Sequence, residues 1–170
     1  MKRTAIVGVG SPTGDDRAGW IALEALEAQF TAPERAAAGV TTAVLDRPGA
    51  ALLEYLRDVE RAVVVDALRG GVPGSLVLLR VDHLQRDAAR TSTHGIGVAE
   101  ALALGAALKL LPPELVVIGI TIDECSAAAE VSAPVRRAAP LLARHLAAWA
   151  RAGAVAWPPR LEEAAFARID

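Results

Sequence analysis

Short runs that are apolar at every position constrain the fold of this chain most. Residues 63–65 (Val-Val-Val) and 116–118 (Val-Val-Ile) are such runs, and a strand is apolar on both faces only where helices cover both sides of its sheet. Three further strand-like segments, with helical patterns between most of them, indicate an α/β fold. We expect strands at 5–9, 40–45, 62–66, 75–81 and 115–120, and helices at 15–30, 48–58, 95–110 and 132–152.

The connection at residues 70–74 shows that the sheet is not wholly parallel. Its sequence, Gly-Gly-Val-Pro-Gly, leaves no room for a helix, so the strand at 75–81 should run antiparallel to at least one neighbour. We therefore predict a single α/β domain with a mixed, mostly parallel, five-stranded twisted sheet sandwiched between helices. This domain should span 1–152, and 153–170, which lack a clear pattern, should form a C-terminal extension.

Composition excludes several classes of partner. The net charge is −2 and no basic stripe is interleaved with aromatic residues, which argues against a nucleic acid ligand. The most apolar region, 95–120, is interrupted by charged residues and prolines, so no membrane span is expected. Cys125 is the only cysteine, which rules out a disulfide or a multi-thiolate metal site within the chain. A reducing cytoplasm suits such a chain.

The turn at residues 8–16, Gly-Val-Gly-Ser-Pro-Thr-Gly-Asp-Asp, joins the first strand to the first helix and points to a functional site. Its glycines do not have the spacing of a dinucleotide fingerprint, and Asp15 and Asp16 would repel a pyrophosphate. The turn could instead hold a cation, or a carboxylate that moves a proton. In the alternative interpretation, Asp15 is an N-cap and Asp16 a favourable acid in the first helical turn.

Two other turns carry candidate groups. Asp66 ends the strand at 62–66, where open α/β sheets collect functional groups, although an aspartate there can also bond backbone N–H groups of the loop. His94 directly precedes a helix, whose N-terminus favours neutral imidazole, the form that binds metals; alternatively it bonds loop backbone. Together with Asp16 these residues could form an oxygen, oxygen and nitrogen site for a divalent cation.

Five motifs in order resemble those of the nickel-iron hydrogenase maturation endopeptidases. They are GVGSPTGDD at 8–16, VVVDA at 63–67, STHG at 92–95, VVIGI at 116–120 and VSAPV at 131–135, and the likeness covers about residues 1–149. Each motif is weak alone, but their order and spacing are fairly specific. The resemblance implies a mixed sheet between helices and an endopeptidase that acts on the hydrogenase large-subunit precursor.

The resemblance also implies roles for individual residues. The metal-binding trio of the family falls on Asp16, Asp66 and His94, and the substrate would be a precursor whose nickel is already inserted and whose short C-terminal extension is then removed. Nickel would be supplied by the precursor, and no tightly held intrinsic metal is expected. Either Asp16 or Asp66 would act as general base, or the metal would polarise the scissile carbonyl. The rival interpretation is a non-catalytic chaperone that binds nickel or the precursor.

Departures from the family pattern lie around the trio. Ser11 replaces an asparagine, Arg17 replaces a glycine, and Asp46 is followed by Arg47 rather than by the usual Gly-Gly-Thr. We predict that Asp16, Asp66 and His94 converge on one crevice at the carboxyl ends of the strands. Asp46 and Arg47 should lie at its rim and help to select the precursor without contacting the metal.

Overall fold

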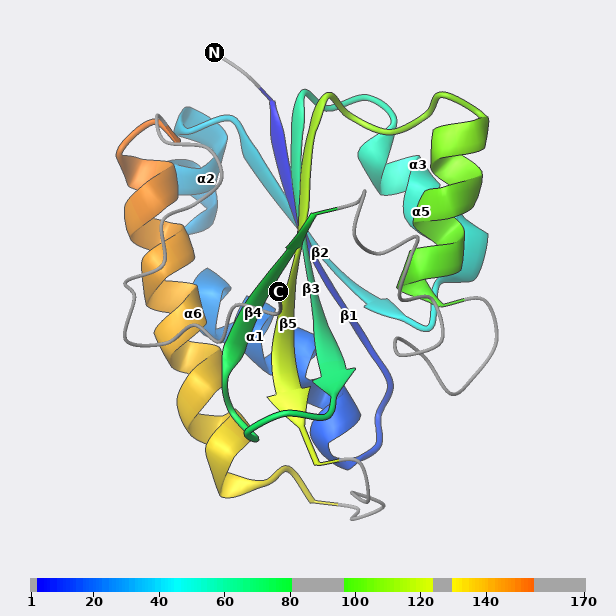
Figure 1. The fold of residues 1–170 in the computed structure, drawn as a ribbon. Coiled ribbons are helices and arrows are strands. Elements are labelled where there is room, and N and C mark those ends of the chain that lie inside the picture. The colour runs from blue at the N-terminus through cyan, green and yellow to red at the C-terminus, as the bar shows by residue number, and fades with distance from the viewer. Residues whose placement is uncertain (1–2, 81–96, 124–129, 155–170) are drawn as a thin grey trace.

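A computed structural model describes residues 3–80, 97–123 and 130–154. They form the predicted α/β fold around one five-stranded sheet, in the order β2-β1-β3-β5-β4 (Figure 1). Neighbouring strands run parallel except β4, which is antiparallel to β5, as the short connection predicted. The strands are β1 (Thr4–Gly10), β2 (Val40–Asp46), β3 (Arg61–Arg69), β4 (Leu76–Arg80) and β5 (Glu114–Ile122).

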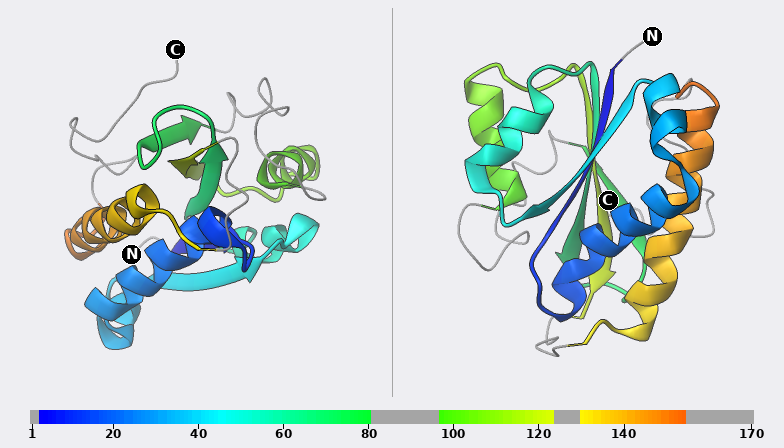
Figure 2. Two further views of the ribbon diagram at one scale, coloured as in Figure 1. Left: turned by 90° about the horizontal axis from the view of Figure 1, so that it is seen from below. Right: turned by 180° about the vertical axis from the view of Figure 1, so that it is seen from behind.

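Helices cover both faces of the sheet. On one face α1 packs along α6, with α2 at one end, and on the other face α3 lies beside α5 (Figures 1 and 2). The helices are α1 (Ala18–Gln29), α2 (Ala32–Ala37), α3 (Leu52–Leu56), α5 (Val98–Ala107) and α6 (Ala133–Arg151), and two 3₁₀ turns, η1 (Gly14–Arg17) and η2 (Gly49–Ala51), precede α1 and α3. None of the helices among the described residues is both long and apolar enough to cross a membrane.

The predicted helices at 15–30 and 48–58 are both shorter than expected at their N-terminal ends. Gly14 and Gly49 have φ of +48° and +52°, values that L residues adopt rarely, and each begins a 3₁₀ turn rather than an α-helix. The turn η1 is functionally relevant because it carries both adjacent aspartates. The extension predicted at 153–170 falls mostly outside the described residues and stays a prediction.

Alternating residues of β3 belong to two hydrophobic clusters, one on each face of the sheet. Val63 and Val65 pack with residues of α1 and α6, whereas Ala62 and Val64 pack with residues of α3 and α5. All four are fully buried, which explains why the strand is apolar at consecutive positions. On α6 an apolar stripe is also buried, and its residues are Val135, Ala139, Leu142, Leu146 and Trp149.

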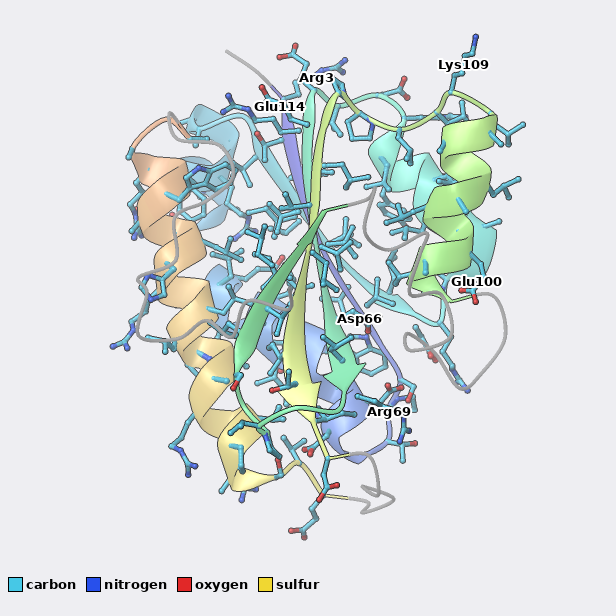
Figure 3. All side chains as sticks on the ribbon, viewed as in Figure 1. Arg3, Asp66, Arg69, Glu100, Lys109 and Glu114 are labelled. Atoms are coloured by element: carbon cyan, nitrogen blue, oxygen red, sulfur yellow. The ribbon has the colours of Figure 1, made fainter. Side chains whose placement is uncertain are left out.

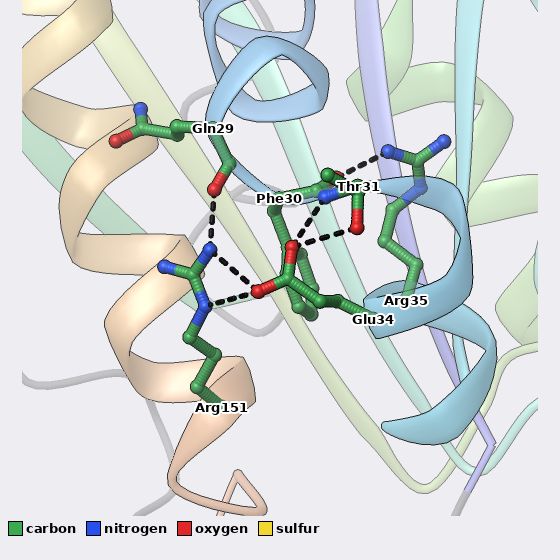
Figure 4. Close-up of polar contacts among 6 residues, drawn as sticks. All are labelled: Gln29, Phe30, Thr31, Glu34, Arg35 and Arg151. Carbon is green, nitrogen blue, oxygen red and sulfur yellow. Dashed lines mark hydrogen bonds and ion pairs between the residues drawn. The ribbon is translucent and has the colours of Figure 1, made fainter.

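Helix α2 was not predicted from the sequence, because its six residues are too few to show a helical period, although Thr31 and Glu34 have the spacing of a capping box. The backbone N–H of Thr31 donates to the Glu34 carboxylate over 2.7 Å, which caps the first turn (Figure 4). Arg151 of α6 donates from Nε to the same carboxylate over 3.1 Å, and its guanidinium lies 5.2 Å from the centroid of the Phe30 ring. Sequence periodicity carries no signal for such long-range contacts.

Arg61 anchors the far end of α6 at the amino edge of the sheet. Its side chain is nearly buried, pairs with Glu114 at the start of β5, and donates to the carbonyl oxygen of Ala154, just beyond α6. This contact joins residues 93 positions apart. A buried arginine that lost its partners would cost free energy, so the contacts of Arg61 are favoured and fix the end of α6 against β3 and β5.

Candidate functional site

The sheet opens between β1 and β3 at their carboxyl ends. These strands pair only as far as Gly8 and Val65, after which β3 continues with β5 alone as far as Arg69. The connections leave β1 and β3 in opposite directions, and ligands of open α/β sheets bind at such a switch point. Asp66 is the first residue of β3 beyond the pairing. The prediction that the strand ends there was wrong, because β5 supplies three further partners.

The side chain of Asp66 is partly buried. Asp66 has the same parity along β3 as Ala62 and Val64, and its side chain lies on the α3 and α5 side of the sheet (Figure 3). The pKa of Asp66 is raised to about 8, chiefly by burial; the N–H of Ala67, which donates to Oδ1 over 2.8 Å, lowers it, and the negative charge of Asp16 makes a smaller contribution that raises it. Asp66 does bond a backbone N–H, but that of Ala67, which lies in β3 and not in the loop that was predicted to follow Asp66, and the carboxyl group also has a strongly raised pKa.

Asp16 lies in η1, close enough to act electrostatically on Asp66. Its backbone is held on both sides. The N–H of Ser11 donates to the Asp16 carbonyl oxygen over 3.3 Å, and the N–H of Asp16 donates to Thr13 over 3.1 Å. The structure thus brings Asp16 of η1 within electrostatic range of Asp66 of β3, 50 positions away in the sequence, and the charge of Asp16 opposes ionisation of Asp66.

Gly8 and Gly10 allow the backbones of η1 and α1 to pack closely against the end of β1. A Cβ atom on Gly8 would lie 2.4 Å from the carbonyl oxygen of Gly19, and one on Gly10 would lie 2.2 Å from that of Asp16. In α1, a Cβ atom on Gly19 would lie 2.3 Å from the carbonyl oxygen of Val9. Contacts shorter than 3.0 Å are essentially never seen for real Cβ atoms, so α1 and η1 rest directly on the backbone of the sheet. This close approach places Asp16 at the opening.

Asp46 and Arg47 form an exposed ion pair beside the same turn. Asp46 is the last residue of β2 and pairs with Gly10, whose carbonyl accepts from the N–H of Arg47 over 2.9 Å. Arg47 Nε lies 2.6 Å from Oδ1 of Asp46, and Nη2 lies 3.2 Å from Oδ2. These bonds lower the pKa of Asp46 and, with the charge of Asp16, raise the pKa of Arg47. Arg47 has φ of +40°, which is uncommon for a residue with a side chain.

Asp15 does not cap the helix that follows it. The N-cap of α1 is Arg17, whereas Asp15 is buried and its Oδ1 accepts a 2.6 Å hydrogen bond from the backbone N–H of Ser132, the N-cap of α6. The N-cap interpretation was therefore wrong for α1. Sequence analysis could not identify the contact with Ser132, because the two residues are 117 positions apart.

His94 lies outside the described residues, so its approach to Asp16 and Asp66 stays a prediction. Within 3–80, 97–123 and 130–154, no three His, Cys, Asp or Glu side chains are grouped closely enough to hold a metal ion. The two aspartates supply oxygen donors at one opening, and a third donor would have to come from elsewhere. The metal-ligand and catalytic roles of Asp16 and Asp66 stay predictions as well.

Comparison with known proteins identifies the family and the fold. The hydrogenase maturation protease family model, HycI, matches residues 22–149. Among solved structures, the hydrogenase maturating endopeptidase HybD from E. coli has a TM-score of 0.70 and 21% identity, covering 89% of this chain and 94% of HybD. The [NiFe] hydrogenase maturation protease HycI from Thermococcus kodakarensis has a TM-score of 0.64 and 22% identity, covering 86% of this chain and 91% of that one.

A third solved structure is the [NiFe] hydrogenase maturation protease HybD from Thermococcus kodakarensis. It is 25% identical to this chain with a TM-score of 0.63, and the match covers 86% of this chain and 97% of that HybD. No curated protein matches the chain at a significant level. The structural likeness at these identities establishes the fold, and the family model covers well over half of the sequence. The chain therefore belongs to the hydrogenase maturation protease family.

Proposed function

We propose that this protein is the endopeptidase that removes the C-terminal extension of a nickel-iron hydrogenase large-subunit precursor after nickel insertion. The observation that carries the proposal is the electrostatically coupled pair Asp16 and Asp66 at the switch point of the sheet. Perturbed acids gathered in a cleft are typical of sites that transfer protons or bind cations. Family membership supports peptide hydrolysis as the reaction.

The proposed substrate brings its own nickel. Asp16, Asp66 and His94 are the proposed ligands, and two carboxylates with an imidazole suit a borderline divalent cation whose remaining positions are filled by the precursor. Docking of the ion would place the scissile peptide beside the carboxylates. Water then adds to the peptide carbonyl, the C–N bond breaks and the leaving amine takes a proton. We assign the proton transfers to Asp16 and Asp66, and locate the reaction in the cytoplasm.

Processing assays with nickel-loaded and nickel-free precursor test this proposal. We expect the wild-type protein to shorten only the nickel-loaded precursor, as seen by a shift of the large subunit on a gel. His94→Ala should abolish the shift without changing the circular dichroism of the protein. Efficient cleavage of the nickel-free precursor, or full activity of His94→Ala, would contradict the mechanism. Binding of the precursor without any shortening would instead identify a chaperone.

Substrate selection should depend on the charge of Arg47. The ion pair of Asp46 and Arg47 is exposed and lies beside Asp16, where an approaching precursor would meet it. Arg47→Glu places two acids at the rim, so we expect the ratio of kcat/KM between two large-subunit precursors with different extensions to change by about 5-fold or more, the effect of about 1 kcal/mol.

Arg57→Glu is a matched control for this charge reversal. Arg57 is also exposed and also pairs with the following residue, Asp58, over 3.3 Å, but it lies at the end of α3, away from the turn that carries Asp16. The control should leave the ratio unchanged. If Arg47→Glu lowers processing of both precursors equally, or of neither, Arg47 has no role in selection.

A further inference from the structure

Adjacent aspartates of η1 lie in different surroundings. Asp16 is partly exposed and interacts with Asp66, whereas Asp15 is only 4% exposed. Oδ1 of Asp15 accepts from the N–H of Ser132 over 2.6 Å, at the N-terminus of the 19-residue helix α6. Unpaired N–H groups and the positive end of the helix dipole stabilise a carboxylate there. Asp15 therefore connects the turn that carries Asp16 to another part of the fold.

The start of α6, to which Asp15 is bonded, is itself held in place. Pro134, in the first turn of α6, packs against Gly74 so closely that a Cβ atom on Gly74 would lie 2.9 Å from its Cβ. The body of α6 packs along α1, which directly follows η1. The Ser132 N–H is thus a fixed donor. A carboxylate that bonds to it loses the freedom to rotate, and the backbone of its neighbours loses freedom as well.

On the other side, η1 is held by the end of β1. The carbonyl oxygen of Asp16 accepts from the N–H of Ser11 over 3.3 Å, and Gly10 leaves no space in which this carbonyl could shift toward the strand. The bond from Ser11 is long, so it alone is a weak restraint. Asp15 supplies the shorter hydrogen bond to the same turn.

We propose that Asp15 is a positioning residue, whose buried carboxylate, bonded to the Ser132 N–H, fixes the turn that presents Asp16 to the opening between β1 and β3. This inference rests on the proposed function for the role of Asp16. Asp15 does not touch the reacting groups. Its removal should let η1 move, so that Asp16 is present but misplaced.

Paired substitutions at both ends of the hydrogen bond test the proposal. Asp15→Ala removes the acceptor, whereas Asp15→Asn keeps an acceptor oxygen in the same position. Ser132→Pro removes the donor while tolerating the backbone, since φ of Ser132 is −68° and proline fixes φ near −65°. Ser132→Ala keeps the N–H and removes only the hydroxyl, which accepts a long 3.5 Å bond from Val135.

We expect Asp15→Ala and Ser132→Pro to lower kcat for precursor processing by about 10- to 100-fold, with KM changed by less than about 3-fold. Asp15→Asn and Ser132→Ala should stay within about 3-fold of wild type. The double variant Asp15→Ala/Ser132→Pro should be no worse than either single variant, because both remove one interaction. Leu146→Ala, buried further along α6, should lower Tm without lowering kcat at temperatures where it is folded.

Amide hydrogen exchange provides a readout that is independent of activity. The Ser11 amide, which bonds to Asp16, should exchange faster in Asp15→Ala and Ser132→Pro than in wild type or in Leu146→Ala. A lower Tm with unchanged kcat and unchanged Ser11 exchange would mean that Asp15 is merely structural, and would overturn the proposal. If Asp15→Ala does not fold, the comparison of Ser132→Pro with Ser132→Ala decides the question by the same two measurements.

An Asp16→Ala variant separates this inference from the proposed function. If Asp16→Ala keeps full processing activity, the proposed role of Asp16 is wrong, although Ser11 exchange still reports whether Asp15 holds the turn. If Asp16→Ala is inactive while Asp15→Ala has wild-type kcat, the proposed function stands and the positioning role of Asp15 fails.

Discussion

Replacing Asp66 by Asn is expected to stabilise the folded protein, by an amount that grows with pH, while it removes processing activity. The pKa of Asp66 is about 8 in the folded protein, above its ordinary value of 3.8. Well below pH 3.8 Asp66 holds its proton in both the folded and the unfolded state, so it makes stability independent of pH there. Between about pH 4 and 8 the unfolded chain releases a proton that the folded protein retains, so stability falls as pH rises. Asn carries no charge and avoids this loss.

At about 1.4 kcal/mol per pKa unit the whole shift corresponds to about 6 kcal/mol, and because Asp66 is partly exposed, solvent screening reduces this. The gain from Asp66→Asn should therefore be about 1 kcal/mol at pH 5 and on the order of 3–5 kcal/mol at pH 8 and above. Urea denaturation at several pH values measures it. Processing should fall by at least about 10²-fold, the usual contribution of a group that transfers protons. A substitution that stabilises the protein but inactivates it is typical at positions where the natural residue serves function at a cost in stability.

Asp46→Asn is the control for Asp66→Asn. Arg47 lowers the pKa of Asp46, so its ionised form is favoured in the folded protein and contributes stability above the unfolded-state pKa that is lost as pH falls. Its substitution should therefore destabilise, weakly because the pair is exposed, and with the opposite pH trend. A gain from Asp66→Asn that does not change with pH, or a loss of stability, would show that burial does not perturb this carboxyl.

Gly19→Ala is expected to destabilise the protein severely, although alanine is the better helix former. Helix propensity alone predicts a gain, of at most about 1 kcal/mol because Gly19 is only the second residue of α1. The added Cβ would, however, lie 2.3 Å and 2.5 Å from the carbonyl oxygens of Val9 and Val65, which belong to two strands of the sheet. Backbone atoms cannot rotate away, so α1 must lift off the sheet. We expect a loss of about 3 kcal/mol or more, measured by denaturation.

Gly105→Ala is the matched control in α5. There the added Cβ would lie 2.5 Å from a methyl carbon of Leu53 and 2.6 Å from one of Leu111, and such side chains can change rotamer. Its cost should be smaller, about 1–2 kcal/mol. Processing should also differ, because lifting α1 displaces Asp16 whereas a shift in α5 leaves η1 in place. Equal losses of stability in the two variants would contradict the argument from backbone contact.

Local chemistry made most of the fold predictable. The runs at 63–65 and 116–118 are apolar on both faces because α1 and α6 cover one side and α3 and α5 the other, so these strands could be identified without knowing their neighbours. Helix α2 is too short, at six residues, to show a helical period; the capping box of Thr31 and Glu34 is its local signal, whereas the support from Arg151 is distant in sequence. The continuation of β3 beyond Asp66 likewise depends on β5.

The candidate site was predictable in part for the same reason. Asp16 and Asp66 follow strand-like segments, and the carboxyl ends of parallel strands share one edge of a sheet, so their proximity follows from topology. The contact of Asp15 with Ser132 depends on how α6 packs against η1, and two adjacent aspartates look alike in a sequence. The ion pair of Asp46 with Arg47 joins neighbouring residues, but its closeness to Asp16 follows from the pairing of Asp46 with Gly10.

The length of α6 is fixed by contacts at its two ends. At one edge of the sheet, Asp15 accepts from the N–H of Ser132, the N-cap of α6. At the opposite edge, Arg61 donates to the carbonyl oxygen of Ala154, just past the last turn of α6. One inserted residue would add about 1.5 Å and rotate everything beyond it by about 100°, turning the apolar stripe away from the sheet. Both contacts could not then be kept. Natural variants of this protein should therefore preserve the number of residues between Ser132 and Ala154.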